Sequence, residues 1–171
     1  MSFDPQGILR TLVAHRVEFV VIGGIAGAAL GSPTATVDID ICYRRTDANL
    51  GRLAGALEEL NARLRGTNDD VPFLLDARTL AAGDHFTLTT DLGDLDLLGS
   101  PAGTAGFEDL SAGAMSVSLE GFEISVVSLS DLIRMKRAAG RPRDVAELEI
   151  LEALREELEQ EPDKKKKRPR R

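Results

Sequence analysis

Residues 37–41 alternate apolar and acidic side chains in the order Val-Asp-Ile-Asp-Ile. A period of two is typical of a β-strand, in which successive side chains point to opposite faces. Asp38 and Asp40 therefore share one face of the predicted strand. Aspartate is rare in strands, and two carboxylates that converge repel each other unless a cation lies between them. Mg²⁺ commonly takes one or two protein carboxylates and completes its shell with water and phosphate oxygens. The alternative is an edge strand whose acidic face meets water.

A second strand precedes this one. Residues 18–22 (EFVVI) form a continuous β-branched and aromatic run, as expected of a strand buried on both faces, and Gly23-Gly24 ends it. The small-residue segment 25–30 is predicted to be helical. Two glycines here leave room for a phosphate near backbone N–H groups. Such a pair is more often a tight turn, so its value lies in the acidic strand that follows.

The remaining periodicities predict an α/β fold with a mixed β-sheet flanked by helices. Further helices are predicted from Asp4-Pro5, over residues 46–65 and 131–139, and from Pro142; further strands are predicted over residues 86–90, 94–98, 115–119 and 122–127. The last helix is expected to direct inward the side chains of Val145, Leu148, Leu151, Leu154 and Leu158.

The charge distribution separates a body from a tail. The chain has 171 residues, of which 43% are hydrophobic, enough for one core, and we expect one domain over residues 1–161. Residues 164–171 hold seven of the 21 basic residues, which leaves 14 basic against 28 acidic residues, a net charge of −14, in the body. We expect residues 162–171 to form a disordered basic tail, which either binds nucleic-acid phosphates or only aids solubility.

Two classes of protein are disfavoured. No apolar run approaches the roughly 18 residues needed to span a bilayer, and the N-terminus lacks a signal-peptide pattern, so we expect a cytoplasmic protein without a membrane partner. The single cysteine, Cys42, excludes an intramolecular disulfide, and no Cys/His cluster has zinc-ligand spacing. Cys42 is interpreted as packed at a strand end.

Together, the motifs VVIGG and TVDIDI resemble the signature of the nucleotidyltransferase superfamily of the DNA polymerase beta type. This signature is a strand, a Gly-Gly or Gly-Ser turn, and Asp-x-Asp on the next strand. The resemblance implies a third metal carboxylate on a later strand, for which Asp96 in GDLDLL is the candidate and Asp94 the competing choice. It implies Mg²⁺ as cofactor and a nucleoside triphosphate as substrate. The catalytic and metal-binding residues that it implies are Asp38, Asp40 and Asp96, and the glycines beside the nucleotide are Gly23 and Gly24.

Residues 129–151 are similar to the closing helices of toxin nucleotidyltransferases of the AbiEii and MenT type, which occur in toxin–antitoxin pairs. Those enzymes keep a lysine and a later aspartate near the nucleotide, and these match Lys136 and Asp144. Arg141 is a further phosphate or base contact by position. Lys136 is expected to take part in catalysis by stabilising the charge on the leaving pyrophosphate.

One position departs from the family pattern. Many relatives have an arginine four residues before the first metal aspartate, whereas this chain has Thr34. A contact with the triphosphate would then come from another cation, for which the candidates are Arg134, Lys136, Arg137 and Arg141.

The acceptor is left open between several classes. Resemblance to the toxins implies transfer of a nucleotide, expected to be a pyrimidine, to the 3′ end of tRNA, with the basic tail binding RNA and an antitoxin as partner. A small-molecule nucleotidyltransferase acting on a cationic compound such as an aminoglycoside suits the charge of −14. Transfer to a protein, and an inactive nucleotide-binding module supported by the missing arginine, are further alternatives.

Overall fold

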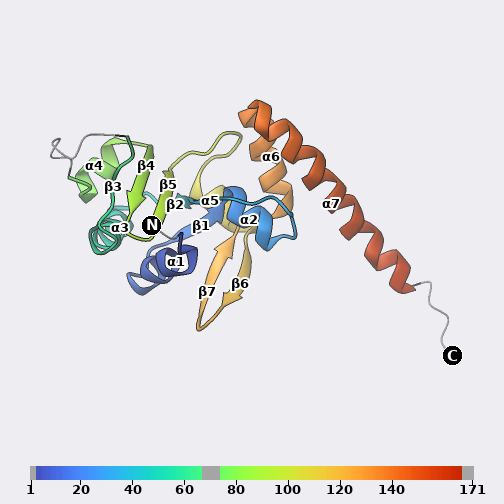
Figure 1. Ribbon diagram of the computed structural model, residues 1–171, viewed down its shortest axis with the longest axis horizontal. Coiled ribbons are helices and arrows are strands. Elements are labelled where there is room, and N and C mark those ends of the chain that lie inside the picture. Colours follow the sequence, from blue (N-terminus) through green and yellow to red (C-terminus); the bar gives the residue numbers. More distant parts are fainter. Residues whose placement is uncertain (1–2, 67–73, 167–171) are drawn as a thin grey trace.

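The computed structural model describes residues 3–66 and 74–166. In chain order its elements are α1 (Pro5–Ala14), β1 (Phe19–Ile22), α2 (Gly23–Ala29), β2 (Asp38–Tyr43), α3 (Asp47–Glu59), β3 (Arg63–Leu64), α4 (Ala77–Ala82), β4 (His85–Thr90), β5 (Gly93–Leu98), α5 (Phe107–Gly113), β6 (Met115–Leu119), β7 (Phe122–Val126), α6 (Leu129–Ala139) and α7 (Pro142–Lys166). The strands form one mixed sheet in the order β3-β4-β5-β2-β1-β7-β6, flanked by helices (Figure 1). The predicted fold class is confirmed.

The central strands β1, β2 and β5 hold the core and position the acidic residues. Every residue of β1 is buried, whereas β2 buries Ile39 and Ile41 and leaves Asp38 and Asp40 partly accessible. β1 pairs antiparallel with β2, and β2 pairs parallel with β5. The continuous apolar run and the alternating run therefore occupy neighbouring strands, one covered on both faces and the other with an acidic face.

Local signals place the helix starts. The Asp4 carboxylate accepts a hydrogen bond from the Gly7 N–H at the start of α1, with Pro5 as the first helical residue. Ser128 caps α6 by accepting from the Asp131 N–H. Both helices begin within two residues of the predicted starts, and the strands predicted over residues 115–119 and 122–127 pair antiparallel as β6 and β7.

The helix predicted over residues 46–65 is wrong in its last turns. α3 ends at Glu59, Asn61 adopts a φ of 51°, and the chain then enters β3, which pairs antiparallel with β4. Asparagine tolerates the left-handed conformation better than most residues do, so Asn61 ends the helix although the apolar spacing continues to Leu64. Arg65 consequently follows a strand at the sheet and does not lie on a helix.

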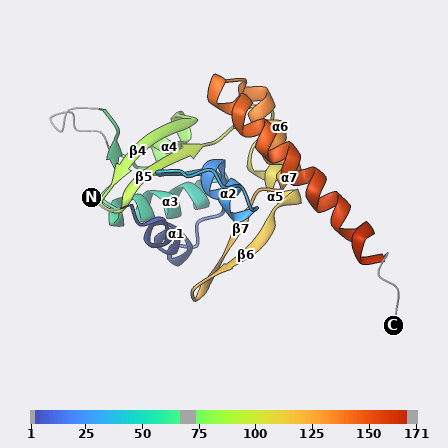
Figure 2. The ribbon, with the colours of Figure 1, turned by 45° about the vertical axis from the view of Figure 1, so that its right-hand side comes forward.

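The orientation predicted for the last helix is wrong at Val145 and Leu158, which are 54% and 49% exposed, whereas Leu151 is 3% exposed. α7 extends away from the rest of the molecule, so the body covers only part of it (Figures 1 and 2). Its backbone remains helical to Lys166, beyond the boundary placed at residue 161, and residues 167–171 lie outside the described residues. None of the helices in the described ranges combines the length and the apolar character needed to cross a bilayer.

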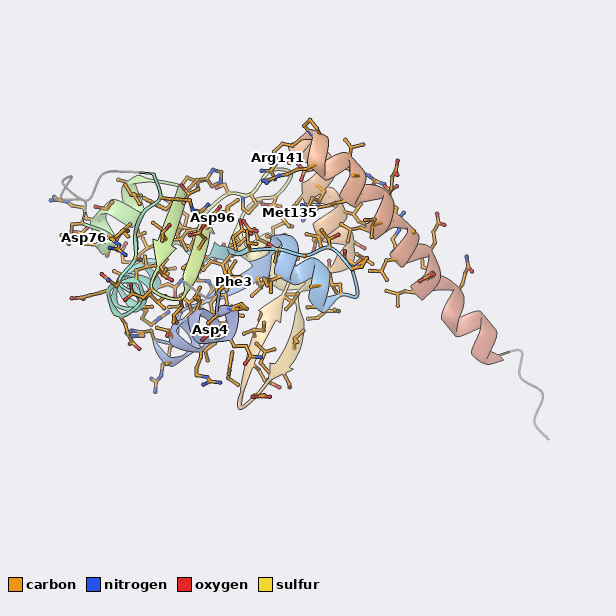
Figure 3. All side chains as sticks on the ribbon, in the orientation of Figure 1. Phe3, Asp4, Asp76, Asp96, Met135 and Arg141 are labelled. Carbon is orange, nitrogen blue, oxygen red and sulfur yellow. The ribbon has the colours of Figure 1, made fainter. Side chains whose placement is uncertain are left out.

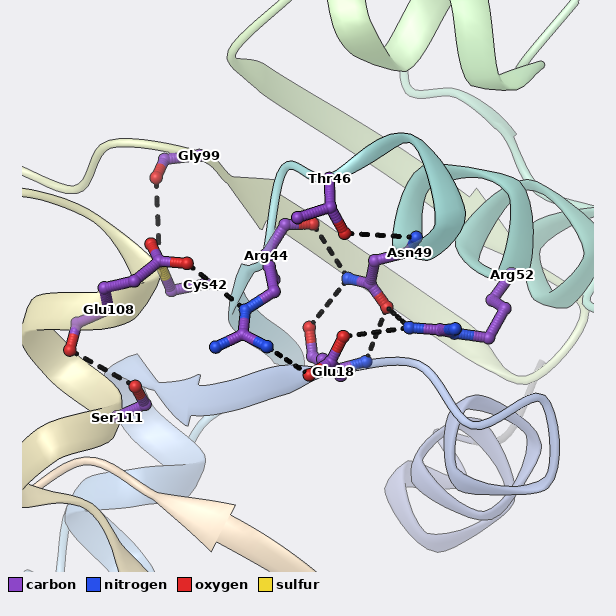
Figure 4. Close-up of polar contacts among 9 residues, drawn as sticks. All are labelled: Glu18, Cys42, Arg44, Thr46, Asn49, Arg52, Gly99, Glu108 and Ser111. Carbon is purple, nitrogen blue, oxygen red and sulfur yellow. Dashed lines mark hydrogen bonds and ion pairs between the residues drawn. The ribbon is translucent and has the colours of Figure 1, made fainter.

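A polar network joins the N-terminal side of β1 to the C-terminal end of β2 (Figure 4). Asn49 is fully buried; its Oδ1 accepts from the Glu18 N–H at 2.7 Å, and its Nδ2 donates to the carbonyls of Glu18 and Arg44 at 3.0 and 2.8 Å. The Glu18 carboxylate pairs with Arg44 at 2.5 Å and with Arg52 at 2.9 Å. We call Glu18, Arg44, Asn49 and Arg52 the Asn49 network.

Cys42 lies on β2 and is fully buried, packed as the sequence indicated. Its Sγ is 3.7 Å from the Gly99 carbonyl oxygen, to which it donates (Figure 4). Burial, assisted by the charges of Asp84 and Glu108, raises the pKa of Cys42 to about 12. The thiolate, which is the reactive form of cysteine, is therefore scarce at neutral pH.

Candidate active site

A cavity of about 670 Å³ opens where β1 ends and β2 begins. Figure 3 shows Asp96 on the sheet, and Met135 and Arg141 at α6 and the start of α7; all three line this cavity. Acidic groups are concentrated on its sheet wall and basic groups on its helical wall. Its charged lining residues are Asp38, Asp40, Asp96, Lys136, Arg141, Arg143 and Glu147.

Sheet register brings the predicted acidic residues together. In the parallel pairing of β2 with β5, Asp38 is opposite Asp94 and Asp40 is opposite Asp96. Burial, and after it the charges of Asp38 and Asp96, raise the pKa of Asp40 to about 6, against the opposing effect of the cations on the helical wall. The ionised form of Asp40 is therefore disfavoured on this wall, first by burial and then by the neighbouring carboxylates.

The competing choice, Asp94, is occupied by structural contacts. Its Oδ1 accepts from the Thr89 hydroxyl at 2.9 Å, and its Oδ2 is 3.2 Å from Arg65 Nε. Among the described residues that line the cavity, Asp96 is present and Asp94 is not. Asp96 accepts a hydrogen bond from Arg65 Nη2 at 2.7 Å. Burial raises the pKa of Asp96 and outweighs the opposing charge of Arg65.

The two glycines fit closely against the acidic strand. Gly23 has a φ of 65°, and a Cβ added to it would stand 2.0 Å from Asp40 Oδ2. A Cβ at Gly24 would stand 2.6 Å from the Cβ of Thr36, whose hydroxyl donates to Asp38 Oδ1 at 2.7 Å. The glycine pair thus leaves room for the acidic strand itself.

The predicted lysine and aspartate of the last two helices form one ion-pair cluster. Asp144 is fully buried and pairs with Lys136 Nζ at 3.2 Å and with Arg141 Nε at 2.7 Å. Glu147 also pairs with Lys136. Burial alone would raise the pKa of Asp144, but the hydrogen bonds from Arg141 and Lys136 prevail and lower it. Asp144 lies behind the cavity wall, where it positions the two cations that line it.

Of the four cations considered as replacements for the family arginine, two line the cavity and two do not. Lys136 and Arg141 line the cavity, whereas Arg134 pairs with Asp109 and Asp131, and Arg137 pairs with Glu152. The described residues that line the cavity also include Thr34, which stands in the position of that arginine.

Sequence reasoning missed two cations of this region. Arg65 was assigned to a helix, although Asn61 four residues earlier is a residue type that ends helices, and this signal would have placed Arg65 beyond the helix. Arg143 lines the cavity as well, and only its position in the first turn of α7 reveals it.

The acidic wall of the cavity supplies some of the ligands that a divalent cation needs. Across the described ranges, no three His, Cys, Asp or Glu side chains are grouped closely enough to form a complete metal-binding set. Asp38 and Asp40 nevertheless supply two carboxylates to one cavity, and Mg²⁺ usually takes no more than one or two from a protein. Burial and the neighbouring carboxylates raise the pKa of Asp40, and a bound cation would oppose both by favouring the ionised form.

Comparison with known proteins identifies the fold. No protein-family model matches the chain, and no curated protein matches its sequence. Its structure is similar to that of the lincosamide antibiotic adenylyltransferase LnuA, bound to lincomycin (TM-score 0.59, 14% identity, covering 90% of this chain and 99% of that one). It is also similar to the antibiotic-resistance factor ANT(2″)-Ia (0.51, 17%, 94% and 94%) and to TM1012 of Thermotoga maritima, assigned as a nucleotidyltransferase (0.50, 18%, 94% and 97%). The chain therefore has the fold of the nucleotidyltransferases.

Proposed function

We propose that the chain is a cytoplasmic, Mg²⁺-dependent nucleotidyltransferase that moves an NMP group from a nucleoside triphosphate to an acceptor hydroxyl. The observation that supports this most is the placement of Asp38, Asp40 and Asp96 on one wall of a cavity whose other wall presents Lys136 and Arg141. A triphosphate needs cations, and an attacking hydroxyl needs a proton acceptor. The cavity offers both.

In the proposed reaction, Asp38 and Asp40 hold the metal ion, which supplies charge neutralisation to the phosphates when bound. The acceptor oxygen forms a bond to the α-phosphorus while the bond to the bridging oxygen of pyrophosphate breaks. Asp96 takes the proton of the hydroxyl. Lys136 and Arg141 stabilise the charge that develops on the leaving pyrophosphate, and Gly23 and Gly24 leave space for the triphosphate along the cavity wall.

For the acceptor, we propose the 3′ end of tRNA, with the chain acting as the toxin of a toxin–antitoxin pair. The support is the sequence similarity of residues 129–151 to such toxins and the basic run 164–171, whose first three residues are the last three of α7. This run is separate in sequence from residues 1–163, which carry a net charge of −14, and it supplies seven basic residues to RNA phosphates.

A small-molecule acceptor is the second candidate. LnuA, crystallised with lincomycin, and ANT(2″)-Ia, an antibiotic-resistance factor, are matched over 99% and 94% of their lengths. The acidic sheet wall would also attract a cationic acceptor. On this proposal the basic tail has no part in acceptor binding.

One experiment separates the two acceptors. The protein is incubated with each α-³²P-labelled NTP and Mg²⁺, together with either total tRNA or a panel of aminoglycosides and lincosamides, and products are separated by gel and by thin-layer chromatography. Label in tRNA that declines on removal of residues 164–171 supports the first acceptor; label on a small molecule, unaffected by that truncation, supports the second.

The control for this experiment is a pair of carboxylate variants. Asp38→Ala is expected to abolish label transfer, whereas Glu120→Gln, an exposed carboxylate at the turn between β6 and β7, is expected to leave it unchanged. Transfer by Asp38→Ala at the wild-type rate would contradict the proposed function for either acceptor.

A further inference from the structure

Two identical Asp-x-Asp pairs lie side by side in the sheet. Asp38 and Asp40 on β2 are aligned with Asp94 and Asp96 on β5 by the parallel register. Both pairs are partly accessible, and they differ in what surrounds them. The comparison between them indicates where a metal ion can bind.

The pair on β5 already has a cation. The Arg65 guanidinium places Nε 3.2 Å from Asp94 Oδ2 and donates from Nη2 to Asp96 Oδ1 at 2.7 Å. Nη2 also donates to the Leu88 carbonyl at 3.1 Å, which fixes the guanidinium to β4. Arginine remains charged at any physiological pH, and its planar fork suits carboxylate oxygens.

The pair on β2 has no such cation. In the described part of the chain, neither Asp38 nor Asp40 forms an ion pair; Asp38 accepts a hydrogen bond from the Thr36 hydroxyl. Lys136, on the opposite wall of the cavity, pairs with Asp144 and Glu147. Asp38 and Asp40 on β2 are therefore the carboxylates that can bind a divalent cation.

We propose, building on the proposed function, that Arg65 takes the place of a second metal ion, so that the site binds a single divalent cation, at Asp38 and Asp40. A dication at Asp96 would have to displace a charge-assisted hydrogen bond or lie within a few ångströms of a guanidinium charge that repels it. Asp96 then remains free of metal and available to the acceptor hydroxyl. Arg65 acts as a positioning residue, since it touches Asp96 and not the reacting atoms.

The test counts bound Mn²⁺ and does not depend on turnover. Full-length protein is saturated with an NTP analogue whose α,β-bridging oxygen is replaced by methylene, and Mn²⁺ bound in excess of that held by the free analogue is measured by electron paramagnetic resonance at pH 7.5. One Mn²⁺ per chain is expected for the wild type. Arg65→Gln, which removes the competing charge, is expected to bind two.

Two further variants make the test specific. Arg65→Lys keeps a positive charge beside Asp96 and is expected to bind one Mn²⁺, as the wild type does. Arg63→Gln, on β3 two residues before Arg65, removes an arginine whose ion pair is with Asp91, at 3.9 Å, and is also expected to bind one. Asp40→Asn is expected to weaken that single site at least tenfold, since it removes one of its two carboxylates.

The outcomes separate the inference from the function on which it rests. Two Mn²⁺ per wild-type chain, or one Mn²⁺ in a folded Arg65→Gln protein, would overturn the role of Arg65 and leave the proposed nucleotidyl transfer intact. Failure of the wild type to bind any Mn²⁺ with the analogue would overturn both. The wild-type count decides the matter even where Arg65→Gln does not fold.

Discussion

The two ends of β2 carry polar clusters of opposite character. Beyond its C-terminal end, the Asn49 network pairs each charge: the Glu18 carboxylate meets Arg44 and Arg52, and the buried amide of Asn49 is bonded through both its oxygen and its nitrogen. At its N-terminal end, Asp38 and Asp40 share a cavity with Asp96, and Asp40 has a pKa raised to about 6.

The contrast teaches what separates a structural cluster from a candidate active site. Both clusters consist of ordinary charged and polar residues close to the same strand, so composition does not distinguish them. A network whose charged groups form ion pairs within the protein stabilises the fold. A cluster whose charges are not balanced by the protein is suited to a ligand that balances them, and perturbed pKa values mark such places.

The largest expected effect, from Asp40→Asn, would sharpen this contrast. Transfer should fall by at least about 10³-fold, equivalent to about 4 kcal/mol, because a metal-binding charge is lost. The metal-free variant should nevertheless be more stable than the wild type at pH 7.5, by on the order of 1–3 kcal/mol.

The sign of this stability difference follows from the pKa of Asp40, which burial and neighbouring carboxylates raise from 3.8 to about 6. Protonated Asp40 is favoured in the folded state, so its contribution to stability is full below pH 3.8 and is lost as the pH rises through about 6. Thermal unfolding of both proteins from pH 4 to 8 should show that the stability of Asp40→Asn relative to the wild type increases with pH. A variant less stable than the wild type at pH 7.5 would contradict the raised pKa of Asp40.

The second prediction tests the balanced cluster. Asn49→Ala leaves the Glu18 N–H and the Arg44 carbonyl oxygen without the Asn49 amide, whereas the Glu18 carbonyl keeps the Arg44 N–H, and it should lower the free energy of unfolding by about 3 kcal/mol. Transfer per folded molecule should be unchanged below the unfolding transition. Urea unfolding followed by circular dichroism measures the loss, with Gln160→Ala, an exposed amide of α7, as the control. A large loss of transfer in the folded variant would break the distinction between the two clusters.

The third prediction concerns the fit of the glycine turn against the acidic strand. Gly23→Ala should reduce transfer by about 10²-fold, or about 3 kcal/mol, because its Cβ would meet Asp40 Oδ2 at 2.0 Å and its φ is 65°. Gly51→Ala is the matched control, since nothing lies within 4 Å of its Cβ and α3 should gain up to about 1 kcal/mol. Equal transfer by both variants would remove the evidence for the close fit.

The smallest effect is expected from Asp144→Asn. This variant tests whether the ion pairs of Asp144 with Lys136 and Arg141 stabilise the fold, as those of the Asn49 network do. The hydrogen bonds from Arg141 and Lys136 outweigh burial and lower the pKa of Asp144, so its stabilising contribution is present above its unfolded value and is lost as the pH falls through the folded value. The variant should be less stable by about 2 kcal/mol at pH 7, and the gap should close below pH 4. A gap that is independent of pH would count against the ionic interpretation.

The acidic site could be predicted because its signals are local. The period of two in residues 37–41 fixes which side chains share a face, and Gly23-Gly24 marks the end of the preceding strand. The choice of Asp96 over Asp94 also agrees with the cavity lining, and Asp94 is held by Arg65 and Thr89.

The remaining features depend on tertiary structure. Apolar spacing that continues to Leu64 concealed the turn at Asn61, and with it the position of Arg65. Along α7, periodicity identifies the apolar residues but not the point at which the body ceases to cover the helix, so Leu158 was assigned to the interior. Both errors arose because sequence spacing describes one element at a time.

Because Cys42 is buried, its reaction with alkylating reagents can report the opening of the central sheet. With its only thiol enclosed on β2 and its pKa raised to about 12, alkylating reagents have no target until the central sheet comes apart. The rate at which a maleimide dye labels Cys42 would therefore report how often the sheet opens around β2, the strand that carries Asp38 and Asp40. A ligand that binds those two residues should lower this labelling rate.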